Sequence, residues 1–256
     1  MKHRLNIAFL ILAYAAIITA SFYYDVSRWW LLLPTALFLI IAGLGSAFIK
    51  SQYHVKALCG IKTTRRQVSI TFDDGPTPAT EQVLDLLHKY NMKGTFFCIG
   101  KQIEKYPQIL ARTVSEGHTI GNHTYSHSSK LSLFSNKQVV QEIMRTNELI
   151  ANATGLEAKL FRPPFGVTAP NIAKALRATA HTVIGWNIRS LDAVTEDEQK
   201  IFKRIKSRVR PGSIILLHDT SLKSVNVLEQ LLVLLQENNY EAITVDRLLN
   251  ITAYEE

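Results

Sequence analysis

The hydrophobic pattern divides the chain into two unlike parts. Residues 5–23 and 29–49 are two apolar runs without a charged side chain, and the only charged residues between them are Asp25 and Arg28. Each run, folded as a helix, is long enough to cross the hydrocarbon core of a bilayer, which is about 30 Å thick. Tyrosines and tryptophans flank the short loop between the runs, as is typical of a membrane interface. The pattern predicts a transmembrane hairpin over residues 1–50.

A cleaved signal peptide is the alternative interpretation of the first run, because Lys2 and Arg4 precede it and the small residue Ala20 lies near its end. The run is long for a signal sequence, however, and a second full-length run follows it directly. Lysines and arginines lie before the first run and after the second, while the connecting loop is nearly neutral. The positive-inside rule therefore predicts an integral protein of a cell membrane with both ends of the hairpin in the cytoplasm.

The pattern changes after a polar, basic linker at residues 51–66. Short apolar runs predict seven strands, at residues 67–72, 94–99, 118–121, 159–162, 181–188, 212–217 and 241–245. Stretches with helical periodicity separate them, at residues 80–90, 136–153, 169–178, 196–209 and 225–238. This alternation predicts a single α/β domain over residues 67–256. We favour a distorted (β/α)7 barrel over an open doubly wound sheet.

The charge of the chain limits the classes of partner that we expect, whereas its cysteines do not identify its compartment. The formal net charge is +8, of which +3 belongs to residues 1–50. The remaining excess is modest and is not interleaved with aromatic residues, so we expect no nucleic acid and favour anionic lipid headgroups or a phosphate-bearing substrate. Two cysteines, Cys59 and Cys98, leave the redox compartment open.

Candidate catalytic residues gather where the predicted strands end. Asp73 and Asp74 follow the first strand, and His123 and His127, four residues apart, follow the third. Two adjacent carboxylates repel each other unless a positive charge stands nearby. A metal ion held by one aspartate and by both histidines, on one face of a helical turn, would supply that charge and leave a position for water. The pattern predicts metal-assisted hydrolysis, with a helix cap and two ordinary loop histidines as the alternatives.

Four motifs occur in a fixed order along the chain. They are Thr71-Phe-Asp-Asp-Gly75, His123-x-x-x-His127, Arg162-Pro-Pro-Phe-Gly166 and Leu216-Leu-His218-Asp219. Across about residues 67–250 their order and spacing resemble the polysaccharide deacetylases, the NodB-homology group of carbohydrate esterase family 4. The resemblance implies a hydrolase that acts on an amide bond of an N-acylated amino sugar.

The resemblance implies a role for each motif residue. Asp74, His123 and His127 would bind a divalent metal ion, usually Zn²⁺, with Asp73 as the general base and His218 as the general acid.

The same resemblance places further residues around the substrate. Arg162 would hold Asp73 ionised and oriented, and the backbone N–H of Phe165 would help to stabilise the oxyanion. Leu216, two residues before His218, would lie next to the substrate.

One family motif, ordinarily Asp-x-x-Asp-Trp, is altered to Arg189-Ser-Leu-Asp192-Ala193. Asp192 can still pair with His218 and raise its pKa, which would keep the histidine protonated near neutral pH. Ala193 in place of tryptophan implies an acyl pocket that is roomier or is filled from elsewhere, for example by Trp186. Acetyl specificity is therefore open.

These features predict a membrane-anchored, zinc-dependent N-deacylase whose catalytic domain lies in the cytoplasm. Its substrate would be an N-acetylated amino sugar of a glycan or of a lipid-linked saccharide, and membrane lipid would be a second partner. The alternatives are a peptidoglycan deacetylase outside the membrane and a non-catalytic sugar-binding scaffold.

Overall fold

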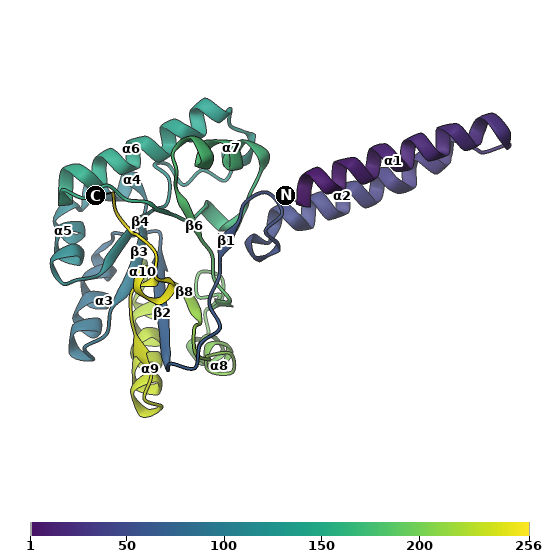
Figure 1. Cartoon of the computed structure of the whole chain (residues 1–256). Coiled ribbons are helices and arrows are strands. Elements are labelled where there is room, and N and C mark those ends of the chain that lie inside the picture. The colour runs from purple at the N-terminus through teal and green to yellow at the C-terminus, as the bar shows by residue number, and fades with distance from the viewer. Residues whose placement is uncertain (1, 256) are drawn as a thin grey trace.

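The computed structural model describes residues 2–255 and shows an elongated helical hairpin attached to one side of an α/β domain (Figure 1). Helices α1 (Lys2–Tyr23) and α2 (Leu32–Ala47) form the hairpin, with a short 3₁₀ turn, η1 (Arg28–Leu31), between them. Helix α1, and α2 taken together with η1 as Arg28–Ala47, are long and apolar enough to cross a membrane, a test that a signal sequence near the N-terminus also passes. Their side chains are mostly exposed in the structure, so apolar surface covers the length of the hairpin.

Polar and close-packed contacts dock the open end of the hairpin onto the domain. Asn6 of α1 is buried and donates from Nδ2 to the hydroxyl of Tyr53 at 2.7 Å. Ser46 of α2 shares a hydrogen bond of 3.0 Å with Nε2 of His54. Gly45 lies so close to the ring of Tyr53 that a β-carbon there would clash with it. The hairpin therefore meets the domain through a packed joint.

A curled parallel sheet forms the centre of the domain. Its strands run in the order β1-β6-β5-β4-β3-β2-β8-β7, and β9 pairs with the start of β2. The bounds are β1 Ala57–Leu58, β2 Gln67–Asp73, β3 Gly94–Cys98, β4 Thr119–Asn122, β5 Leu160–Phe161, β6 Thr182–Ile184, β7 Ile188–Arg189, β8 Ile214–His218 and β9 Glu241–Ala242. Within residues 2–255 the end strands β1 and β7 do not pair with each other. The predicted distorted barrel is confirmed as a barrel-like sheet that curls without closing.

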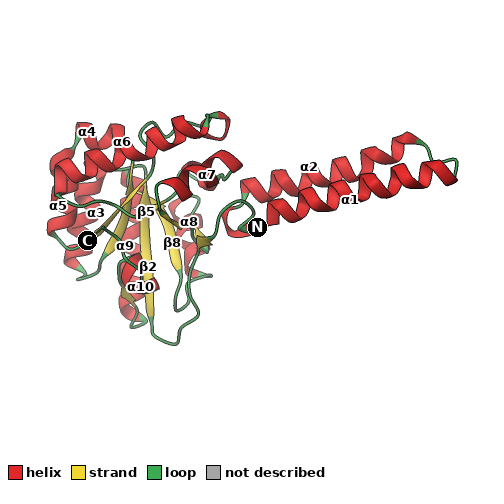
Figure 2. Cartoon of the chain, turned by 45° about the horizontal axis from the view of Figure 1, so that its top comes forward, coloured by secondary structure: helices red, strands yellow, loops and turns green. Residues whose placement is uncertain are grey.

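Helices surround the sheet in Figure 2. They are α3 (Pro78–Lys89), α4 (Gly100–Lys105), α5 (Pro107–Ser115), α6 (Asn136–Thr154), α7 (Pro170–Ala178), α8 (Glu198–Lys206), α9 (Leu222–Glu237) and α10 (Val245–Leu249), with the 3₁₀ turns η2 (Ile49–Ser51), η3 (Leu131–Leu133) and η4 (Pro164–Gly166). A fully buried core, which includes the stacked rings of Phe72 and Phe96, joins the helices to the strands. This core fixes the strand ends that carry the polar motifs.

The structure departs from the sequence-based elements at three places. The single strand expected over residues 181–188 is two strands, β6 and β7, because the backbone leaves the sheet at Gly185, against the sulfur of Cys59. Strand β1 lies inside the predicted linker and pairs with β6. Helices α4 and α10 were not predicted, since each is too short for helical periodicity to stand out. Helix α5 was also not predicted, although it is as long as α7 and α8. The division into 1–50, 51–66 and 67–256 stays a prediction.

Candidate metal centre

Strand register brings the four motifs to one end of the sheet. Asp73 ends β2 and is directly paired with His218, which ends β8. Asn122 ends β4 and is paired with Phe161 of β5, so the residues that follow, His123 and Arg162, emerge side by side. The carboxyl ends of parallel strands are where active sites of β/α barrels lie.

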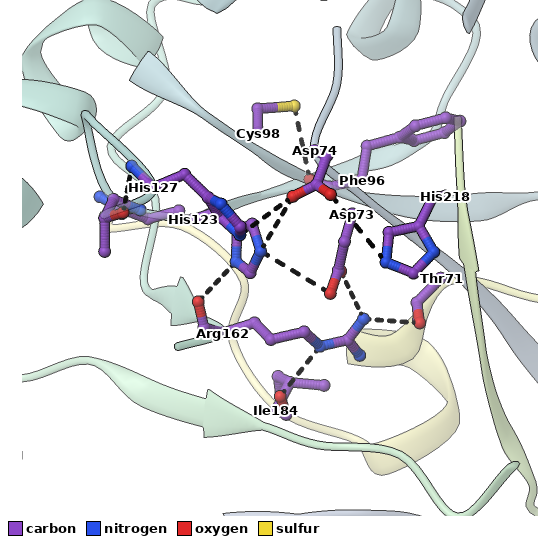
Figure 3. Close-up of polar contacts among 12 residues, drawn as sticks. Thr71, Asp73, Asp74, Phe96, Cys98, His123, His127, Arg162, Ile184 and His218 are labelled. Carbon is purple, nitrogen blue, oxygen red and sulfur yellow. Dashed lines mark hydrogen bonds and ion pairs between the residues drawn. The ribbon is translucent and has the colours of Figure 1, made fainter. Parts of the chain in front are cut away.

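Asp74, His123 and His127 converge at this end (Figure 3). Oδ1 of Asp74 lies 3.5 Å from Nε2 of His123 and 3.2 Å from Nε2 of His127. One ligand atom from each residue lies within 4.8 Å of the other two. Three such donors can hold a divalent ion and leave a coordination position open, as catalytic zinc sites do.

The sequence suggested that the two histidines lie on a helical turn, but they do not. Residues 123–128 form a loop after β4. Thr124 and His127 have left-handed backbones, with φ of +67° and +51°, and Asp74 has φ of +77°. Such conformations are uncommon for residues with a β-carbon and cluster at functional sites. The loop path, and not a helix face, aims both imidazoles at Asp74.

The donor set fits a metal ion. Oδ1 of Asp74 is buried and has no hydrogen-bond partner among the described residues, so it faces the two imidazole nitrogens alone. Nδ1 of His123 donates to the carbonyl of Arg162 at 2.7 Å, which leaves the lone pair of Nε2 for a metal. Burial opposes ionisation of Asp74, but the nearby imidazoles of His123, His127 and His218 lower its pKa to about 2. A carboxylate is thus available as a ligand near neutral pH.

Asp73 is held by a buried arginine. Arg162 is fully buried and donates from Nη1 to Oδ1 of Asp73 at 2.7 Å and to Oγ1 of Thr71 at 2.8 Å. Its remaining nitrogens donate to the carbonyls of Ile184 and Gly185. A charge-assisted pair of this kind is strong because both groups are removed from water. The other oxygen of Asp73 lies 3.8 Å from Nε2 of His123, beside the candidate metal site.

His218, beside Asp73 at the end of the neighbouring strand β8, is paired with Asp192. Nδ1 of His218 lies 2.8 Å from Oδ1 of Asp192, and its Nε2 faces Asp74 at 4.0 Å. Burial lowers the pKa of His218, but the hydrogen bond and charge of Asp192, with Asp73 and Asp74, raise it to about 9. Without a metal ion, His218 is therefore protonated at neutral pH and can donate a proton from Nε2.

The remaining candidate residues lie around the rim or below it. Phe165 is 51% exposed, and its ring centroid lies 4.7 Å from that of His127. Trp186 packs against Gly166, where a β-carbon would come within 2.5 Å of its ring. Leu216 is only 2% exposed, on the same face of β8 as His218. Trp186 is thus placed beneath the loop that carries Phe165, while Leu216 offers little surface.

Two serines that the sequence did not single out complete the support of Asp192. Ser190 donates to its Oδ1 at 2.6 Å and Ser224 to its Oδ2 at 2.8 Å. The backbone N–H of His218 also donates to Oδ2, at 2.8 Å. Ser224 comes from α9, so only the folded arrangement reveals its role.

Comparison with known proteins agrees with these motifs. The family model described as polysaccharide deacetylase matches residues 60–184. A peptidoglycan-N-acetylglucosamine deacetylase of Bacillus cereus is 31% identical over 195 residues, which cover 74% of this chain and 91% of the relative. The chain belongs to the polysaccharide deacetylase family. The resemblance stated from the motifs is confirmed.

Other polysaccharide deacetylases extend the comparison. The peptidoglycan-N-acetylmuramic acid deacetylase PdaC of Bacillus subtilis is 31% identical over 189 residues, 73% of this chain and 40% of the relative. The crystal structure of the Bc1960 peptidoglycan N-acetylglucosamine deacetylase superimposes with a TM-score of 0.73, at 29% identity, over 77% of this chain and 94% of that one. The match spans 40% to 57% of the length of the first three curated relatives.

Proposed function

We propose that the chain is a metal-dependent deacetylase that hydrolyses the N-acetyl amide of an amino sugar. The observation that carries the proposal is one arrangement of side chains. Asp74, His123 and His127 form a triad. Asp73, which Arg162 holds, lies next to His123 of the triad, and His218 lies next to Asp74 of the triad. Family membership, with relatives named as peptidoglycan deacetylases, supports the same reaction class.

Each side chain has a task that its surroundings support. Zn²⁺, our proposed metal, would polarise the amide carbonyl and acidify a bound water when held by the triad. Asp73, oriented by Arg162, accepts the proton that the attacking water loses. His218 gives its Nε2 proton to the amide nitrogen as the C–N bond breaks, so that acetate and the free amine form. The N–H of Phe165 lies on the loop next to His127, where it would face the oxyanion.

We further propose that residues 1–50 anchor the domain in a membrane with both ends in the cytoplasm. The charge pattern supports this orientation, with cations before the first apolar helix and after the second. The substrate would then be an amino sugar on a lipid carrier at the inner leaflet. The relatives' printed names favour the alternative, N-acetylglucosamine or N-acetylmuramic acid of peptidoglycan outside the membrane.

Acetate release tests the reaction. The full chain in detergent is assayed with N-acetylglucosamine oligomers and with lipid-linked N-acetyl amino sugars, before and after a chelator and for Asp73→Asn. We expect loss of turnover in both treatments and recovery of the chelated enzyme with Zn²⁺. Asp85→Asn is a matched control, because Asp85 is an exposed carboxylate paired with Arg112. Turnover that survives both treatments contradicts the proposal, and sugar binding without turnover supports a scaffold.

Reporter fusions test the orientation. Phosphatase is active only outside the cytoplasm, so a fusion directly after Lys50 should be inactive and a fusion in the loop at Asp25 should be active. The opposite pattern would assign the domain to the outside and favour peptidoglycan as the substrate.

A further inference from the structure

A basic groove opens beside the base of the hairpin. It has a volume of about 600 Å³, and Lys50, Lys62 and Arg210 line it together with Thr63 and Asn187. Lys50 lies in η2, directly after α2, so the groove begins where the second apolar helix ends. None of its cations belongs to the candidate metal centre.

The backbone holds the walls of the groove together. Ile61 donates its N–H to the carbonyl of Gly212 at 3.0 Å, and Gly60 and Ser213 form an antiparallel bridge. Gly212 has φ of +77° and faces the carbonyl of Ile61 so closely that a side chain would not fit there. Because Lys62 and Arg210 adjoin this crossing, the separation of their backbones is set by the fold and does not depend on a ligand.

The groove carries positive charge without a counter-charge. Among residues 2–255, none of Lys50, Lys62 and Arg210 takes part in an ion pair, whereas other surface cations such as Lys89 do. By contrast, the side chain of Arg204 in α8 is engaged within the protein, because it donates a hydrogen bond to the carbonyl of Arg189. Unpaired cations on a preformed surface attract anions.

The position of the groove selects the anion. Phe48 directly follows α2 and is 61% exposed, while its neighbour Ile49 is 4% exposed and packs in the domain core. A lysine at the end of an apolar helix is typical of the headgroup level of a bilayer, where its ammonium group can reach anionic lipid headgroups. Figure 1 shows β1 and α8, which flank this region, on the side of the domain from which the hairpin extends.

We propose that Lys50, Lys62 and Arg210 bind the headgroup phosphate of an anionic phospholipid, next to the point where the hairpin enters the membrane. The bound lipid would hold the side of the domain that carries β1 and α8 against the bilayer. It would act in addition to the packed joint at Tyr53. This site is independent of the deacetylase reaction, and its test does not measure activity.

Native mass spectrometry of the full chain tests the site. The protein in detergent micelles is titrated with phosphatidylglycerol or phosphatidylcholine, and the number of bound lipids is counted. Each cation near a lipid surface contributes about a fivefold factor in affinity. We expect the preference for phosphatidylglycerol to fall by about fivefold in Lys62→Gln and in Arg210→Gln, and further in the triple variant with Lys50→Gln.

A charge-matched variant provides the control. Lys105→Gln, Lys137→Gln and Arg247→Gln together remove three exposed cations from α4, α6 and α10 and should keep the preference. Equal losses in both triple variants would mean a diffuse electrostatic effect and would overturn the site. Soluble glycerol phosphate that binds the wild type as tightly as phosphatidylglycerol would also overturn it, in favour of a free phosphate ligand. Thermal unfolding of each variant checks that it remains folded.

Discussion

The two halves of the candidate site are held in place by different means. The proton-transfer half consists of Asp73 and His218 and is fixed by buried hydrogen bonds. Arg162, which holds Asp73, donates four of them, and Asp192, which holds His218, accepts bonds from two serines and from His218. The metal half depends on backbone conformation, with left-handed φ angles at Asp74 and His127. Its central oxygen has no hydrogen-bond partner among the described residues. The protein thus completes one half with its own hydrogen bonds, whereas the donor atoms of the other half remain able to bind an ion.

Removal of a metal ligand should have the largest effect. We expect Asp74→Asn to lose bound Zn²⁺ and to lower kcat/KM by about a thousandfold or more, because the ion supplies several kcal/mol of transition-state stabilisation. Metal content by mass spectrometry and acetate release check the two effects on one sample. Full metal content with normal turnover would show that Asp74 is not a ligand.

Removal of the base should separate the two halves. We expect Asp73→Asn to lower kcat by about 10²-fold to 10⁴-fold while Zn²⁺ stays bound, since Asp73 is held by Arg162 and not by the triad. Metal titration of the variant and of the wild type makes the comparison. If Asp73→Asn loses zinc as Asp74→Asn does, the distinction between the halves is wrong.

The smallest expected effect is a shift in pH dependence. Asp192 raises the pKa of His218, so Asp192→Asn should lower the His218 pKa from about 9. Because the general acid must be protonated, activity is lost as the pH rises through this pKa, and the alkaline limb of the profile should move to lower pH. Nuclear magnetic resonance titration of His218 in the metal-free protein measures the shift directly.

A conservative variant serves as the control for this shift. Ser224→Ala removes one of the hydrogen bonds that Asp192 accepts but keeps its charge, so it should move the alkaline limb less. An unchanged limb in Asp192→Asn would mean that another group is the acid.

The same raised pKa predicts a pH dependence of stability. His218 has a higher pKa in the folded protein than its ordinary value of 6.5, so its pairing stabilises the metal-free fold fully below pH 6.5. This contribution is lost as the pH rises toward 9.

Sequence patterns predicted much of the fold and the neighbourhood of the site. Strand β8 was placed within two residues because its run Ile214–Leu217 is apolar throughout, as is typical of a buried parallel strand. Strand β2 was recognised although Ser69 and Thr71 alternate with its apolar residues. Strand β1 was missed because its two residues lie inside the polar, basic stretch of residues 51–66. The helical turn predicted for His123 and His127 was wrong. A spacing of four residues can bring two side chains together in a helix and also in a loop with left-handed residues.

The hydrogen bond from Ser224 to Asp192, the partner of the proposed acid His218, could not have been predicted from a local pattern. Ser224 reaches Asp192 from a helix that begins thirty residues later in the chain, and a serine near the start of a helix ordinarily suggests a cap. The contact depends on how α9 packs beside β8, which no local pattern contains.

With residues 1–50 in a membrane, as proposed, the close contact between Gly45 and Tyr53 would determine how the enzyme meets its substrate. A domain on a flexible tether sweeps a wide volume, but a domain fixed to its anchor keeps its reactive centre at one height above the lipid surface. Encounters would then depend on lateral diffusion of both molecules in two dimensions. Substrates that extend too far from that surface, or not far enough, would not be hydrolysed however well their sugar fitted.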